Sequence, residues 1–236
     1  MQLFDVFMMS FLGLISGGCL GWVCVRLLQG KKFYSLLISG GVLLCLLLIE
    51  LLPEALNTYQ ANGVALGALT GIFGMALLNR FFHKNKRKNL FHSFVFLIVA
   101  IGVHNIPVGL TMGINTGVGD AGVQSSLYSV LFFHLLPEGI ALFIPIFVYQ
   151  YRWLMFLSAI FCLSLIIWIA SWVGFHMPQV YTIRNSSWLM GVAIGTLGYG
   201  AIYEILIPAI KRISKVAALV ILILTFMITF LYFRMM

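Results

Sequence analysis

Long apolar stretches, separated by short polar ones, make up nearly the whole chain. A bilayer core needs about 20 apolar residues per helix, and the runs are continuous rather than alternating, which favours helices over the strands of a membrane barrel. The sequence therefore predicts an all-α integral membrane protein with a single transmembrane domain over residues 1–236. Its eight expected spans run roughly over 3–28, 33–56, 63–82, 92–114, 124–149, 153–175, 187–210 and 215–234.

Composition excludes a soluble globular domain. Only 8% of the residues are charged and 62% are hydrophobic, whereas charged residues make up about 25% of typical soluble domains. Glycines recur at four-residue spacing, which lets membrane helices approach closely and indicates tight bundle packing. These rows are Gly13, Gly17 and Gly21 in the first span, Gly63, Gly67 and Gly71 in the third, and Gly191 and Gly195 in the seventh.

Lysine and arginine are distributed unevenly between the two sides of such a bundle. If the N-terminus lies outside, the inner connections contain all of these residues except Arg184 and Arg234. Because cytoplasmic loops are enriched in Lys and Arg, we predict a multi-pass protein of the plasma membrane with both termini outside and the loop 80–91 in the cytoplasm. This distribution also explains the net charge of +8 without a nucleic-acid partner.

Ionisable side chains inside the spans are the strongest indication of function. A carboxylate at the bilayer centre costs about 2.5–3.5 kcal/mol, so these groups must face the bundle interior, water or a cation. For any single residue, hydrogen bonding between helices is the simpler alternative. The intramembrane set comprises four of the six acidic residues of the chain and two of its five histidines: Glu50, Glu54, Glu138, Glu204, His104 and His134.

Two similar segments place some of these groups on neighbouring spans. Residues 104–109 read His-Asn-Ile-Pro-Val-Gly, and residues 134–139 read His-Leu-Leu-Pro-Glu-Gly. His134 and Glu138 are four residues apart and therefore share one helix face. Each proline follows its histidine by three residues and frees the carbonyl four residues before itself, that of Val103 or Phe133. Broken helices with freed carbonyls aimed at an ion are typical of membrane transporters.

These ligand types favour a divalent transition metal. Imidazole and carboxylate groups suit zinc and its neighbours better than sodium or calcium. We expect His104, His134 and Glu138 to bind the ion, with Asn105 or a freed backbone carbonyl as the fourth ligand.

The paired segments on adjacent spans resemble those of the ZIP (Zrt-, Irt-like protein) family of divalent metal transporters. The resemblance covers essentially the whole chain and implies metal uptake toward the cytoplasm, with zinc favoured, as transported substrate rather than cofactor, and no enzymatic activity. On the matching positions, it implies that His104, Asn105, His134 and Glu138 bind the metal and that Pro107, Gly109, Pro137 and Gly139 shape the helices. In the family a glutamate usually follows the fourth-span proline and bridges two metal positions, but this chain has Val108, which makes a two-metal site doubtful.

The second and seventh spans contain a further similarity. Residues 50–55 read Glu-Leu-Leu-Pro-Glu-Ala, and residues 204–209 read Glu-Ile-Leu-Ile-Pro-Ala. Because these helices run in opposite directions, the pattern indicates an inverted repeat of spans 1–3 and 6–8 around spans 4 and 5. The alternative is that Pro53 and Pro208 end their helices. We predict that Glu50, Glu54 and Glu204 lie along the ion pathway, outside and inside the central site.

Two other functions remain open at this level. A family member that has lost transport would serve as a metal sensor or scaffold, and Val108 is the argument for it. An intramembrane metalloenzyme would need three ligands and an open position, but the chain contains no His-Glu-x-x-His motif. The expected partners are a divalent metal ion and membrane lipid, with a homodimer left open.

Overall fold

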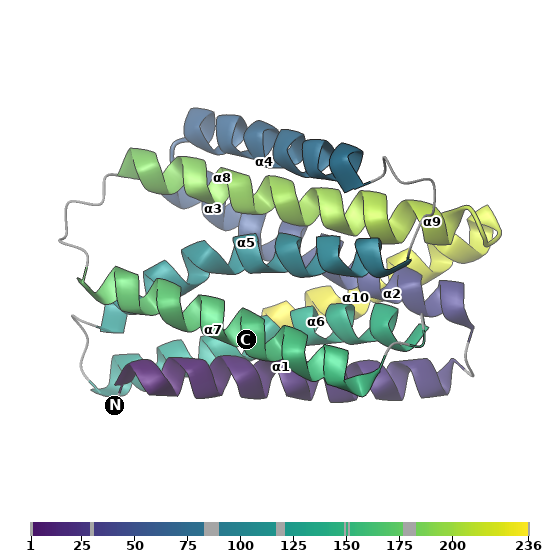
Figure 1. Cartoon of the computed structure of the whole chain (residues 1–236), viewed down its shortest axis with the longest axis horizontal. Coiled ribbons are helices and arrows are strands. Elements are labelled where there is room, and N and C mark those ends of the chain that lie inside the picture. The colour runs from purple at the N-terminus through teal and green to yellow at the C-terminus, as the bar shows by residue number, and fades with distance from the viewer. Residues whose placement is uncertain are drawn as a thin grey trace.

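Helices account for nearly all of the chain in the computed structural model, which describes residues 2–28, 31–82, 90–116, 121–148, 150, 152–176 and 183–235 (Figure 1). Eight of its helical stretches are long and apolar enough to cross a membrane, as the sequence predicted. They are Leu3–Leu27, Lys32–Thr58, Ala61–Arg80, Phe94–Ile114, Leu127–Val148, Trp153–His176, Ser187–Ile210 and Lys215–Arg234. Most of the basic loop expected in the cytoplasm, residues 83–89, lies outside the described part of the chain.

Two of the spans are composite. The second consists of α2, a π-helical segment η1 and α3, and the seventh consists of α8, a second π-helical segment η2 and α9. The elements are α1 Gln2–Leu27, α2 Lys32–Leu46, η1 Leu47–Leu51, α3 Leu52–Thr58, α4 Ala61–Phe82, α5 Leu90–Thr116, α6 Ala121–Val148, α7 Trp153–His176, α8 Ile183–Tyr199, η2 Gly200–Leu206, α9 Ile207–Ile210 and α10 Lys215–Met235.

Successive spans run in alternate directions along a common long axis (Figure 1). Helices α1, α6 and α9 end at the right-hand side of that view, and α1 begins at the left. The central helix α6 packs against α1 and α2, while α5 packs against α7 and α8. The spans containing α2, α6 and α8 are the most buried, whereas α4 and α10 are largely exposed at the periphery.

Both central helices pass through their prolines without a break. α5 continues as an α-helix past Pro107, and α6 continues past Pro137. The expected interruption at mid-membrane is therefore wrong. The Phe133 carbonyl, which Pro137 leaves without its helical partner, instead accepts a hydrogen bond of 2.6 Å from the Tyr232 hydroxyl of α10. Because a neighbouring helix satisfies this carbonyl, α6 can tolerate the proline in an apolar environment.

The irregular backbone occurs in the second and seventh spans instead. Glu50 lies in η1 and Glu204 lies in η2, and each π-helical segment is followed by a proline in the first turn of the next α-helix. Pro53 and Pro208 do not end these spans, since α3 and α9 continue beyond them. Single π-helical turns recur at functional sites because they change the direction of the side chains that they contain.

Glycine contacts confirm the close helix packing that the sequence predicted. A Cβ atom on Gly17 of α1 would lie 2.9 Å from the Cα of Gly139 in α6, and one on Gly67 of α4 would lie 2.9 Å from the Cα of Gly191 in α8. Real Cβ atoms essentially never approach so closely. Gly109 plays the corresponding part in α5, where an added Cβ would lie 2.6 Å from a backbone oxygen of α7. The glycines that follow Pro107 and Pro137 thus let both central helices contact their neighbours.

We predict that Gly67→Ala destabilises the protein and that Gly74→Ala does not. The added methyl group at position 67 would collide with the backbone of α8, whereas no atom of the described residues lies within 4 Å of the corresponding position at Gly74 in the same helix. Overpacking of this kind costs about 1–3 kcal/mol. Thermal unfolding of both variants in detergent tests the prediction, and equal unfolding temperatures would contradict it.

Candidate metal centre

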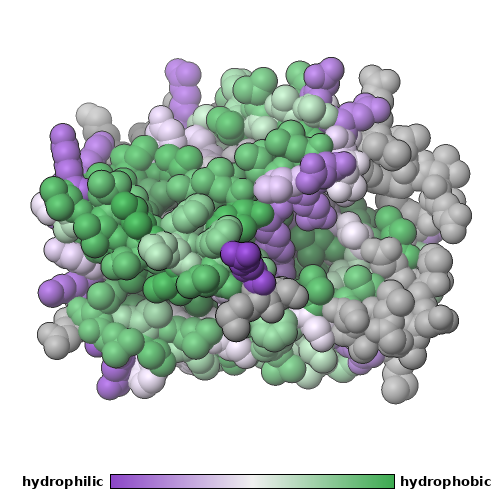
Figure 2. All heavy atoms as spheres, turned by 180° about the vertical axis from the view of Figure 1, so that it is seen from behind, coloured by the Kyte–Doolittle hydropathy of each residue, from purple (hydrophilic) through white to green (hydrophobic). Residues whose placement is uncertain are grey.

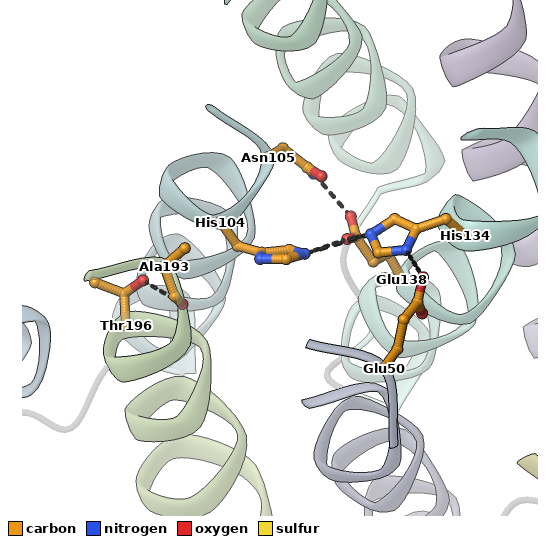
Figure 3. A network of polar contacts seen from close by, with 7 residues as sticks. All are labelled: Glu50, His104, Asn105, His134, Glu138, Ala193 and Thr196. Carbon is orange, nitrogen blue, oxygen red and sulfur yellow. Dashed lines mark hydrogen bonds and ion pairs between the residues drawn. The ribbon is translucent and has the colours of Figure 1, made fainter. Parts of the chain in front are cut away.

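Four polar side chains meet between α5 and α6 in the interior of the bundle (Figure 3). His104 and Asn105 come from α5, and His134 and Glu138 come from α6, where they lie one helical turn apart. All four are buried, and Glu138 has no exposed surface at all. The structure therefore brings together the residues that the sequence selected as metal ligands.

Three ligand atoms point toward one another. The Nε2 atoms of His104 and His134 are 3.4 Å apart, and the Glu138 Oε1 atom lies 3.4 Å from the first and 3.6 Å from the second. A point equidistant from all three lies about 2.0 Å from each, which matches zinc–nitrogen and zinc–carboxylate bonds of about 2.0–2.2 Å. The three atoms thus have the spacing of ligands around one zinc-sized ion.

Hydrogen bonding within the protein does not satisfy this cluster. Within the described part of the chain, Glu138 Oε1 is buried and has no hydrogen-bond partner, and the same holds for Nδ1 of His104 and Oδ1 of Asn105. A buried polar atom without a partner costs about 1–3 kcal/mol, and more when the group is charged. A cation between the three ligand atoms would remove that cost for the carboxylate oxygen.

Asn105 contacts the carboxylate directly. Its Nδ2 atom donates a hydrogen bond of 2.8 Å to Oε2 of Glu138. This bond holds one carboxylate oxygen and directs the other, Oε1, toward the two histidines (Figure 3). In this arrangement Asn105 orients Glu138, and its role as a metal ligand stays a prediction.

Glu50 reaches the centre from the second span. Its Oε1 atom lies 2.6 Å from Nδ1 of His134, so the histidine donates its Nδ1 proton to the carboxylate and keeps the Nε2 lone pair for a metal. A carboxylate behind a metal-binding histidine fixes the orientation of the ring and raises its basicity. From the sequence, Glu50 was predicted to lie near the helix end, among the pathway residues. Its contact with α6 depends on the π-helical segment η1, which residue spacing within one span does not reveal.

A cavity of about 150 Å³ adjoins the centre. Glu50, Glu54 and His134 line it, together with Val108, which takes the place of the second carboxylate of the family motif. Tyr59, beyond the end of the second span, also lines the cavity, and burial together with the charge of Glu54 raises its pKa. The cavity therefore connects the exposed Glu54 with the buried His134.

Glu204 is not part of this centre. It is 8% exposed and lies 3.4 Å from Nδ2 of Asn79, which also donates a hydrogen bond of 2.7 Å to the Tyr199 hydroxyl. The third acidic residue predicted for the pathway is thus a separate buried group between α4 and the seventh span.

Comparison with known families supports the metal centre. A family model described as ZIP zinc transporter matches residues 86–233, a region that includes α5 and α6 with all four polar residues of the centre. No curated protein matches the chain.

The contact between Glu50 and His134 predicts that Glu50→Gln weakens metal binding. Loss of a carboxylate partner behind a metal-binding histidine typically lowers metal affinity about 10–100-fold. Glu54→Gln is the matched control, because Glu54 lines the same cavity and no hydrogen bond to the ligands is found for it among the described residues. Zinc titration calorimetry in detergent measures both variants, and the same affinity in both would exclude an orienting role for Glu50.

Proposed function

This chain belongs to the ZIP zinc transporter family, whose members are transporters rather than enzymes, and we propose that it moves a divalent transition metal, zinc above all, toward the cytoplasm. The observation that carries this proposal is the buried group of His104, His134 and Glu138, whose ligand atoms all lie within 4.8 Å of one another. The group lies inside a bundle of eight membrane-length helices. Ionisable side chains at such a place typically mark the route of an ion across the membrane.

The ligand set supports zinc and its neighbours as substrates. Two imidazoles and one carboxylate supply three protein ligands, and a zinc ion with three protein ligands keeps at least one position open. An open position suits a transported ion, because incoming and outgoing ligands can be exchanged there. With Val108 at the bridging position, we propose one central metal position rather than two.

We propose that Glu54 and Glu50 form the approach to this position on one side of the membrane. Glu54 is exposed and shares the cavity with Glu50, which in turn contacts His134. Glu204 is the corresponding acidic group toward the other side, in the π-helical segment of the seventh span. Carboxylates on both sides would raise the local concentration of a divalent cation.

We further propose that spans 1–3 and 6–8 form an inverted repeat around α5 and α6. The helix contacts support it: α1 packs on α6 as its counterpart α7 packs on α5, and the second span contacts α6 as the seventh contacts α5. Glu50 and Glu204 occupy equivalent π-helical segments. Superposition of the two halves tests the repeat, which would fail if these two glutamates did not coincide.

The distribution of basic residues predicts the orientation. Lys31, Arg152 and Lys211 belong to the connections that follow α1, α6 and α9, which lie at one end of the bundle (Figure 1). We propose that this end faces the cytoplasm of a plasma-membrane protein. In a variant without native cysteines, Arg152→Cys should react with a membrane-impermeant maleimide only after the cells are permeabilised. Labelling in intact cells would reverse the orientation.

Zinc uptake into proteoliposomes tests the proposed transport. His104→Ala and Glu138→Gln each remove a proposed metal ligand. Loss of a residue that only hydrogen bonds a ligand typically lowers metal affinity about 10–100-fold, so these two variants should lose more zinc affinity and more uptake than that. His176→Ala is the control, since this exposed histidine lies at the end of α7 and bonds only the Trp172 carbonyl among the described contacts. Wild-type protein that binds zinc but does not move it would be a sensor or scaffold.

A further inference from the structure

An apolar groove lies on the membrane-facing side of the bundle, away from the metal centre's own cavity. It has a volume of about 470 Å³ and is formed by α1, α2, α6 and α10. Leu28, Val42, Pro137 and Ile221 are among the residues that line it. Leu224, which is 52% exposed, lies at its opening.

The groove has the length of one membrane leaflet. Its lining on α10 runs from Ile221 to Tyr232, a rise of about 16 Å along an α-helix. Half of a hydrocarbon core of about 30 Å has nearly the same depth. One end lies beside Leu28, where α1 ends, and the other lies beside Pro137 at the depth of the metal centre. An extended acyl chain of a single leaflet therefore fits the groove.

Basic residues gather at the end of the bundle at which Leu28 lies. They come from the end of α1 and its connection to α2, and from the connection between α9 and α10, and all of them are exposed. Neither connection contains an acidic residue, and no ion pair of a Lys or Arg occurs in the described part of the chain. This set consists of Arg26, Lys31, Lys32, Lys211, Arg212 and Lys215.

The view of this face agrees with such an arrangement. Figure 2 shows the bundle from behind, with hydrophilic side chains projecting at its left margin, which is the right-hand end of Figure 1, and a broad hydrophobic surface extending from there toward the middle. A surface that is apolar over one leaflet and basic at the edge of that leaflet complements a lipid with an anionic headgroup.

We propose that this groove binds one acyl chain of an anionic phospholipid, whose headgroup is held by the basic residues at the α1–α2 and α9–α10 connections. The bound chain contacts Pro137 and Tyr232, and Tyr232 bonds the carbonyl of the residue that precedes His134. The lipid thereby stabilises the packing of α10 against α6, the helix that carries His134 and Glu138. This proposal does not depend on transport.

The test uses the purified full chain after delipidation in detergent. Phosphatidylglycerol and phosphatidylcholine with identical acyl chains are added separately, and native mass spectrometry counts the bound lipids while thermal unfolding is recorded. One phosphatidylglycerol should be retained, with a larger rise in unfolding temperature than phosphatidylcholine produces. Equal retention and equal shifts for the two lipids would overturn the headgroup assignment.

Two pairs of variants locate the site. Leu224→Trp fills the groove opening and should abolish most of the lipid-dependent shift, whereas Ile223→Trp, which is 50% exposed on the same helix but outside the lining, should retain it. Replacing Lys31 and Lys32 by Gln should remove the preference for phosphatidylglycerol, whereas Arg152→Gln should not. Identical shifts in Leu224→Trp and Ile223→Trp would show that the groove is not the lipid site. A change of oligomeric mass in Leu224→Trp alone would assign the groove to a second copy of the chain and overturn the proposal.

Discussion

The cost of removing a carboxylate from water is the constraint on which the rest of this structure depends. Glu138 is completely buried in a bundle made largely of apolar helices. An ionised carboxylate in such a place costs several kcal/mol unless it is paired with opposite charge and hydrogen bonded. One of its oxygens is held by Asn105, and the other points at two imidazole nitrogens. The arrangement is consistent with a site that a divalent cation completes.

Close helix packing keeps the ligands at this spacing. Gly109 and Gly139 each follow a central proline and allow α5 to contact α7 and α6 to contact α1 through backbone atoms. Larger side chains there would move the central helices away from their neighbours and change the distances between His104, His134 and Glu138. Two residues outside the polar cluster thus position the two helices that carry it.

The loss of a carboxylate at Val108 is offset by one from another span. Glu50 contacts His134 from η1, and Val108 faces the same cavity as Glu50. Glu138 and Glu50 thus bring two carboxyl groups to the centre, one from α6 and one from the second span. The Glu50 carboxyl group reaches the centre through the imidazole ring of His134 and not through the group of converging ligand atoms.

The sequence by itself determined the eight membrane-length helices and indicated the four polar residues of α5 and α6 that meet in the interior. Both depend on local features, namely the length of apolar runs and the one-turn spacing of His134 and Glu138 on one helix face. Only the tertiary structure decided how Glu50 and the Phe133 carbonyl are used. Glu50 bonds a residue 84 positions away, and Phe133 accepts its bond from a residue 99 positions away. Such contacts depend on the rotation of separate helices about their axes and on the π-helical turn in the second span, which no spacing within a single span reveals.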